Sequence, residues 1–238
     1  MRSNIFFMSQ AVLAEFFRPA EWGKQSSVIM AWPSIDNSAY SDSVDDLSDT
    51  TTDITNIAQA VSKFEPVTLL VVQSRLSDAQ STFADSKNIT LLPIQTYPKL
   101  DLWMRDMAPT FAFDGTAADS RLYGVDYNFN GWGNKYPTGS CISLASMILY
   151  KKKIPRVPSS LITEGGSLEV DGEGTLLITD SSILNDNRNP GKTKPEVEDE
   201  LRKTLGVTKF IWIPARKGLD ITDGHIDGLA RFISPGKV

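Results

Sequence analysis

The sequence of 238 residues contains only one cysteine, Cys141, and only one histidine, His225. A single cysteine excludes an intramolecular disulfide and is typical of a protein from a reducing compartment, so we expect the cytoplasm. The two residues are also too few for a structural zinc site, which draws its four ligands mainly from cysteine and histidine. We therefore expect no metal ion.

Long apolar runs and an excess of basic charge are missing as well. No stretch approaches the roughly 18 apolar residues of a membrane span, and we expect a soluble protein with no membrane partner. Lysine and arginine number 24 against 29 acidic residues, which gives a formal net charge of −5. Because nucleic acids attract clustered basic residues, we expect no nucleic-acid partner. With 41% hydrophobic residues, the chain can bury a sizeable core.

Apolar residues follow patterns that alternate between strands and helices along the chain. Helical spacing predicts helices at residues 47–64, 77–86, 140–150 and 194–205. Short apolar runs predict strands within residues 28–33 and at 67–72, 89–94, 167–170, 175–179 and 209–213. This alternation indicates an α/β or α+β fold. Because no low-complexity linker divides the chain, we expect one domain over residues 1–238.

Four short segments place acidic residues beside aromatic, glycine or histidine residues. These segments are Trp103–Asp106, Glu164–Gly166, Asp171–Gly174 and Gly224–Asp227. A planar guanidinium is best bound by carboxylates that accept from its forked N–H donors, with an aromatic surface over its face. Carboxylates that converge on one pocket would thus suggest a cationic ligand, and His225 could move protons beside it near neutral pH.

Each of these residues also has a simpler interpretation, which is the more frequent one when the residue is taken singly. Asp106 could pair with Arg105 or cap a helix. Glu164 could cap a turn, and His225 could be a solvated loop histidine. Core packing is the more frequent role of two tryptophans, Trp103 and Trp132.

Seven segments, taken in order, resemble agmatine deiminases and the related bacterial-type peptidyl-arginine deiminases. They are Glu21–Trp22, Met30–Pro33, Trp103–Pro109, Asn128–Gly133, Glu164–Gly166, Asn185–Pro190 and Asp223–Asp227. The resemblance extends from about Phe17 to Gly236, which is nearly the whole chain. One departure is Ala108, where the family usually has glycine.

The resemblance implies a pentein fold, a ring of five ββαβ-like modules around a central site. It also implies hydrolytic removal of an imino group from a guanidine, without a metal or an organic cofactor. The substrate it favours is agmatine, which yields N-carbamoylputrescine and ammonia in putrescine biosynthesis. Peptidyl-arginine is the alternative substrate.

The resemblance also implies roles for individual residues. Asp106 and Asp227 would grip the guanidinium, and Trp103 would line the substrate channel. Glu164 would orient or polarise His225, which would serve as general acid and base. In such enzymes a cysteine attacks the guanidinium carbon and forms a covalent thiouronium intermediate.

That cysteine lies near the C-terminus of the family's members, in a glycine-rich segment that this sequence does not reach before Val238. Cys141 lies in an apolar helical pattern and is predicted to be a buried, unreactive thiol. We therefore expect a pentein ring that lacks its last module, and no turnover of agmatine by these 238 residues.

Two alternatives remain open, a non-catalytic remnant that binds cationic amines and a structural α/β protein. The oligomeric state is open too, and a homo-oligomer is one alternative.

Overall fold

The computed structural model describes residues 16–34, 46–94, 100–114, 120–136 and 139–238. The strands are β1 (Phe16–Phe17), β2 (Val28–Ala31), β3 (Val67–Val72), β4 (Ile89–Ile94), β5 (Thr110–Asp114), β6 (Arg121–Asp126), β7 (Arg156–Pro158), β8 (Glu169–Val170), β9 (Thr175–Thr179) and β10 (Lys209–Ile213). The α-helices are α1 (Asp46–Val61), α2 (Leu76–Thr82), α3 (Met104–Met107), α4 (Gly131–Asn134), α5 (Leu144–Lys152), α6 (Asp180–Ile183) and α7 (Lys194–Leu205). Four 3-10 turns are η1 (Gln73–Arg75), η2 (Gly139–Ser143), η3 (Gly165–Ser167) and η4 (Ile226–Gly228).

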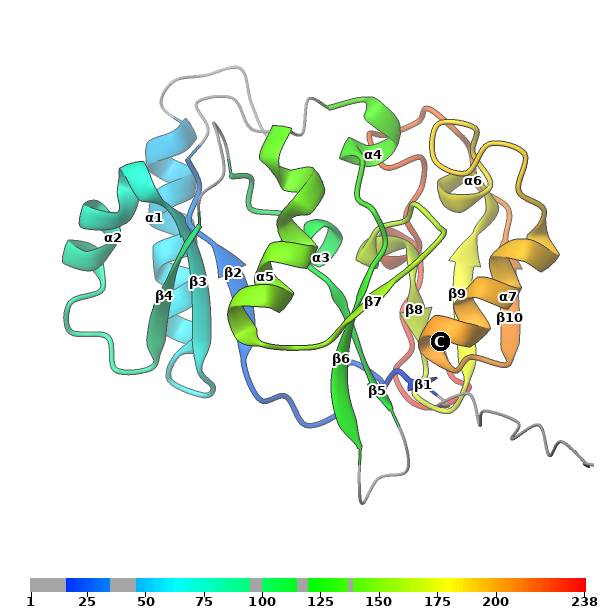
Figure 1. Cartoon of the computed structure of the whole chain (residues 1–238), viewed down its shortest axis with the longest axis horizontal. Coiled ribbons are helices and arrows are strands. Elements are labelled where there is room, and N and C mark those ends of the chain that lie inside the picture. Colours follow the sequence, from blue (N-terminus) through cyan, green and yellow to red (C-terminus); the bar gives the residue numbers. More distant parts are fainter. Residues whose placement is uncertain (1–15, 35–45, 95–99, 115–119, 137–138) are drawn as a thin grey trace, which may run out of the picture.

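The strands form three small sheets that lie side by side, with helices packed around them (Figure 1). The strand orders are β2-β3-β4, β1-β5-β6-β7 and β10-β9-β8. In each sheet, parallel neighbours are joined through a helix: α1 and α2 in the first sheet, α5 in the second and α7 in the third. Parallel strands need such crossover connections. The predicted mixed α/β class is confirmed.

Helix α7 shows how local sequence determines an element of this fold. Thr193 and Glu196 form a capping box at its start, and Gly206 ends it with a φ of 69°. Three apolar residues at a spacing of four face the interior, and these are Val197, Leu201 and Leu205. The helix therefore packs one apolar stripe against the neighbouring sheet.

The core consists mainly of three apolar clusters that join sheets to helices. The first joins β3 and β4 to α5, and its members include Leu70, Ile94, Leu144 and Ile148. The second joins α7 to β9, and its members include Leu176, Ile178, Val197 and Leu201. The third joins the first sheet to α1 and α2, and its members include Ile54, Ala58, Leu69 and Ala79. Helices thus cover both faces of the first sheet.

Several predicted elements differ from the structure. The helices expected at residues 47–64 and 77–86 end earlier, at Val61 and Thr82. Residues 140–150 were expected to be one helix, but η2 precedes α5, which begins at Leu144. Residues 167–170 were expected to be a strand, but only Glu169–Val170 pair as β8. The reason is that Ser167 N–H donates to the Glu164 carbonyl oxygen at 3.0 Å, which closes the turn η3 first.

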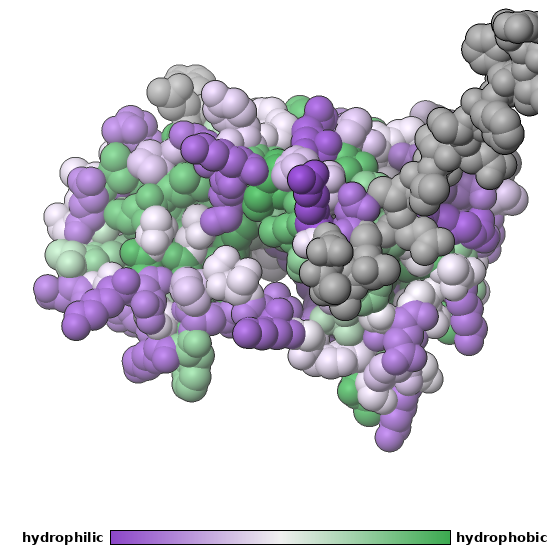
Figure 2. All heavy atoms as spheres, turned by 60° about the horizontal axis from the view of Figure 1, so that its bottom comes forward, coloured by the Kyte–Doolittle hydropathy of each residue, from purple (hydrophilic) through white to green (hydrophobic). Residues whose placement is uncertain are grey.

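The surface carries both apolar and hydrophilic side chains. Figure 2 shows apolar side chains over the half of the molecule that carries β2, β3 and β4, with hydrophilic residues along the rims. Among the described helices, none combines the length and the apolar character needed to cross a membrane.

Candidate active site

Three short turns carry the predicted site residues. Helix α3 contains Asp106, and Trp103 directly precedes it. Glu164 directly precedes η3, while His225 directly precedes η4, which contains Asp227. Because η3 packs against both α3 and η4, residues that lie far apart in the sequence meet there.

Gly166 lies at the point where three of these side chains converge. A Cβ atom added to Gly166 would overlap His225 Nδ1 and lie 2.9 Å from Asp106 Oδ1 and 3.0 Å from Asp227 Oδ2. The missing side chain thus lets two carboxylates and an imidazole come together against the Gly166 backbone. Carboxylates that converge in this way suit a cationic group.

His225 lies between two acidic side chains. Its Nε2 atom is 3.3 Å from Glu164 Oε2, and its Nδ1 atom is 3.7 Å from Asp106 Oδ1. Burial lowers the pKa of His225, but the hydrogen bond with Glu164 and the charge of Asp106 outweigh it and raise the pKa above the usual 6.5. The imidazole is therefore held in its protonated form over a wider pH range than a free histidine.

We predict that Asp106→Asn lowers the pKa of His225, because it removes a negative charge that faces the ring. His225 is the only histidine, so an NMR titration of the imidazole reports on this residue alone. His225 also makes the stability of the fold depend on pH. Its pKa in the folded chain lies above 6.5, so its stabilising contribution is complete below pH 6.5 and is lost as the pH rises through the folded pKa. Asp199→Asn, on the exposed face of α7, is the control. An unchanged pKa in Asp106→Asn would contradict the geometry.

Both oxygens of Asp106 accept hydrogen bonds. Oδ1 accepts from Gly166 N–H at 3.0 Å, and Oδ2 accepts from Trp132 Nε1–H at 2.8 Å. Burial raises the pKa of Asp106, while the charge of His225 and the Trp132 hydrogen bond oppose this rise. Trp132 is buried in the first apolar cluster, as the sequence predicts, but its hydrogen bond to Asp106 was not foreseen.

Asp227 contacts a guanidinium of the protein itself. Arg105 Nε lies 2.9 Å from Asp227 Oδ2, and the same side chain forms ion pairs with Glu21 and Glu169. The simpler interpretation, in which Asp106 pairs with Arg105, is wrong, because Arg105 pairs with three other carboxylates.

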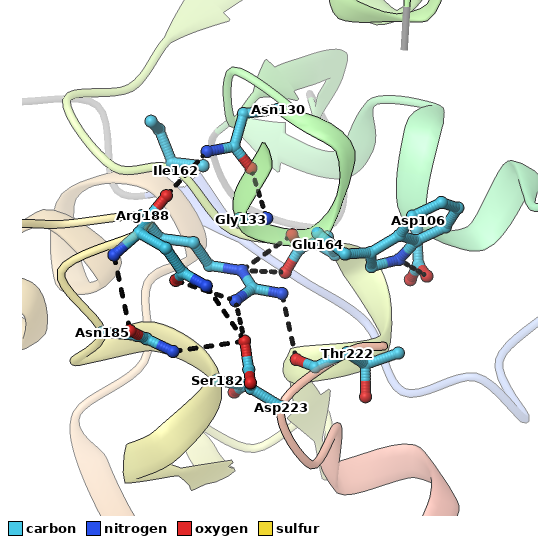
Figure 3. A network of polar contacts seen from close by, with 12 residues as sticks. Asp106, Asn130, Gly133, Ile162, Glu164, Ser182, Asn185, Arg188, Thr222 and Asp223 are labelled. Carbon is cyan, nitrogen blue, oxygen red and sulfur yellow. Dashed lines mark hydrogen bonds and ion pairs between the residues drawn. The ribbon is translucent and has the colours of Figure 1, made fainter. Parts of the chain in front are cut away.

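A buried arginine missed by the sequence analysis, Arg188, holds Glu164 (Figure 3). Its side chain is fully buried, and Nε donates to both Glu164 oxygens at 2.9 and 3.0 Å. Nη1 donates to Asp223 Oδ2 at 2.8 Å, and Nη2 donates to the Thr222 carbonyl oxygen at 3.0 Å. These contacts fix the position of the Glu164 carboxylate, which in turn contacts His225 Nε2.

Asp223 connects this arginine to a second cation. Its Oδ1 lies 2.6 Å from Lys135 Nζ and accepts from Gly218 N–H at 2.8 Å. Burial raises the pKa of Asp223, but hydrogen bonds from Lys135 and Arg188 outweigh it and hold the pKa well below its usual range. Asp223 therefore carries a full negative charge beside Arg188.

Two further predicted candidates are Trp103 and Asp171. Trp103 is 40% exposed at the start of α3, and its role as a channel wall stays a prediction. Asp171 shapes the turn between β8 and β9, where its Oδ1 accepts from the N–H groups of Glu173 and Thr175, each at 2.9 Å. The Asp171–Gly174 segment is thus a structural turn.

Cys141 is buried in the first apolar cluster, as predicted, and burial raises the pKa of its thiol. Within the described residues, no group of three or more histidine, cysteine, aspartate or glutamate side chains is arranged to hold a metal ion.

Solved structures of known enzymes resemble this fold. The agmatine deiminase of Enterococcus faecalis matches with a TM-score of 0.81 and 30% identity over 93% of this chain and 59% of that chain. A substrate-bound agmatine deiminase of C. jejuni matches with a TM-score of 0.80 and 29% identity over 98% of this chain and 65% of that chain.

Curated relatives are similar in sequence. The agmatine deiminase of Medicago truncatula is 36% identical over 94% of this chain and 60% of that protein. That of Ectopseudomonas mendocina is 35% identical over 94% of this chain and 59% of that protein. The chain thus spans about 60% of the length of these relatives. The sequence profile of the Porphyromonas-type peptidyl-arginine deiminases matches residues 17–238. The chain belongs to this family.

Proposed function

We propose that this chain supplies the guanidinium-binding site of a deiminase, a C–N hydrolase of guanidino compounds. The substrate we infer is agmatine, with N-carbamoylputrescine and ammonia as products. The observation that carries this proposal is the convergence of Asp106 Oδ1, His225 Nδ1 and Asp227 Oδ2 beside Gly166. The agmatine deiminases among its relatives support the choice of substrate.

In this proposal, Asp106 and Asp227 bind the guanidinium from two sides. Two carboxylates can neutralise the cation and accept its N–H donors in a fixed plane. The hydrogen bonds to Asp106 and the Arg105 contact of Asp227 do not exhaust these carboxylates, because each ionised carboxylate offers about four lone-pair sites. The ligand can therefore be oriented by groups whose own positions are fixed.

His225 would act as the general acid and base. A nucleophile attacks the guanidinium carbon and forms a covalent bond to it. The bond between this carbon and one nitrogen then breaks as His225 gives a proton to the departing ammonia. A water molecule, activated by the same imidazole, then displaces the nucleophile and completes the ureido product. Glu164 would keep the imidazole oriented, since it is itself fixed by Arg188.

The nucleophile in this proposal is the cysteine thiolate that the family resemblance implies. Cys141 does not suit this role, because it is buried in the apolar cluster and its pKa is raised rather than lowered. A protein that binds cationic amines without turnover is therefore the second candidate. Ammonia release from agmatine, measured beside binding on the chain extended with a relative's C-terminal module, separates the two.

Three coarser expectations belong to the same proposal. We propose that the three sheets are modules of a pentein ring and that residues 1–238 belong to a single domain. The cytoplasm remains our proposed location, on the basis of the single cysteine.

Agmatine binding to the purified chain, measured by calorimetry, tests the site. We predict that Asp106→Asn or Asp227→Asn abolishes the signal, because losing one partner of a buried charge pair costs on the order of 2–5 kcal/mol. Asp199→Asn breaks only a surface ion pair with Arg202 and should bind like the unaltered chain. Full binding by both site variants would place the ligand elsewhere. Stronger binding of a blocked arginine peptide would favour peptidyl-arginine as the substrate.

A further inference from the structure

Helix α4 is a left-handed turn. Its four residues have positive φ angles of 76° at Gly131, 54° at Trp132, 78° at Gly133 and 60° at Asn134. This conformation is open to glycine but costs free energy for a residue with a side chain. A tryptophan in this region is an outlier, and such outliers persist only where surrounding contacts impose them.

Contacts from a neighbouring loop impose this turn. Asn130 Oδ1 accepts from Gly133 N–H at 2.8 Å, and Asn130 Nδ2 donates to the Asn187 carbonyl oxygen at 2.9 Å. A Cβ atom on Gly133 would overlap the side-chain amide of Asn187. Lys135, directly after the turn, is paired with Asp223. The turn is therefore docked on the loop that carries Arg188.

The result of this docking is a fixed position for the Trp132 indole. Its ring packs edge-on against Phe129 and Tyr136, with centroids 5.0 and 6.1 Å away. Its Nε1–H donates to Asp106 Oδ2 at 2.8 Å. Apolar packing alone does not require this N–H group, since a phenylalanine would also fill an apolar space.

We propose that Trp132 is a positioning residue for Asp106, and this rests on the proposed function. By holding Oδ2, the indole N–H turns Oδ1 toward His225 and toward Gly166. The strained turn thus serves to place one donor against the carboxylate that grips the guanidinium. The competing interpretation is that Trp132 only fills the core.

Trp132→Phe tests this proposal, because it keeps an aromatic ring and removes the donor. We expect agmatine binding to weaken roughly tenfold or more, as hydrogen bonds to charged groups contribute strongly. Trp212→Phe is the matched control, since Trp212 Nε1–H also donates to a carboxylate, Glu198 Oε1, at 2.9 Å. The control should bind agmatine as the unaltered chain does. Equal binding by Trp132→Phe and the unaltered chain would overturn the proposal.

The indole N–H resonance reports the contact between Trp132 and Asp106 without the need for agmatine. The Trp132 resonance, identified by its loss in Trp132→Phe, should shift in Asp106→Asn and follow the titration of Asp106, whereas the Trp212 resonance should not. If the unaltered chain binds no agmatine, the proposed function fails, and the resonance still shows whether Trp132 holds Asp106. A Trp132 resonance that is unmoved by Asp106→Asn would overturn that role.

Discussion

We expect Gly166→Ala to abolish agmatine binding, because the added methyl group displaces the side chains that bind the guanidinium. It would lie 2.9 Å from Asp106 Oδ1 and 3.0 Å from Asp227 Oδ2 and would overlap His225 Nδ1, so that these side chains must shift. The φ angle of Gly166 lies outside the positive region, so the backbone itself accepts alanine. The measurement is agmatine calorimetry, with circular dichroism to report on the fold.

Gly228→Ala is the matched control for this prediction. Gly228 lies in η4 one residue after Asp227, and a Cβ atom there would meet nothing within 4 Å. Its backbone φ is not positive either. Agmatine binding should survive this change. Intact binding by Gly166→Ala would mean that the ligand does not bind to Asp106, His225 and Asp227.

Arg188→Met should destabilise the fold by roughly 3–5 kcal/mol, because it leaves the buried Glu164 without its arginine partner and takes from Asp223 one of the two cations that it contacts. Glu164 and Asp223 both contact the Arg188 guanidinium, and all three side chains are buried. Such a loss is a large part of a typical domain stability of about 5–15 kcal/mol. The measurement is the free energy of unfolding from urea titration.

Arg202→Met is the matched control for this arginine. Arg202 also contacts two carboxylates, Glu198 and Asp199, but it lies on the exposed face of α7 with 42% of its side chain exposed. Surface ion pairs contribute about 0–1 kcal/mol, so the free energy of unfolding should change little. Similar losses in both variants would contradict a structural role for the buried network.

Elements with strong local patterns could be predicted from the sequence. The apolar run of β3 follows Pro66 directly, and the ends of α7 are marked by Thr193 and Gly206, so these bounds are confirmed. Strands β5 to β7 were not predicted. β5 pairs with β1, and β6 with β7, across long stretches of the sequence, although β5 and β6 themselves pair as neighbours along the chain. Strand β6 also mixes arginine, glycine and aspartate with its apolar residues.

The residues of the candidate site were likewise predicted only in part. Asp106, Glu164, His225 and Asp227 were predicted because each lies in a short segment that resembles the family, and the structure brings them to one place. Arg188 was not predicted, because an arginine is usually exposed and only tertiary contacts show that this one is buried. The glycines beside Trp132 were the available signal for a turn with unusual φ angles.

The most direct test of the site is a crystal structure of the chain with agmatine. We predict that the guanidinium lies beside Gly166, within hydrogen-bond distance, about 2.7–3.2 Å, of both Asp106 and Asp227. His225 should face the guanidinium carbon from its place between Asp106 and Glu164. Agmatine that binds elsewhere at a saturating concentration, with none beside Gly166, would contradict the assignment of Asp106 and Asp227 to the guanidinium site.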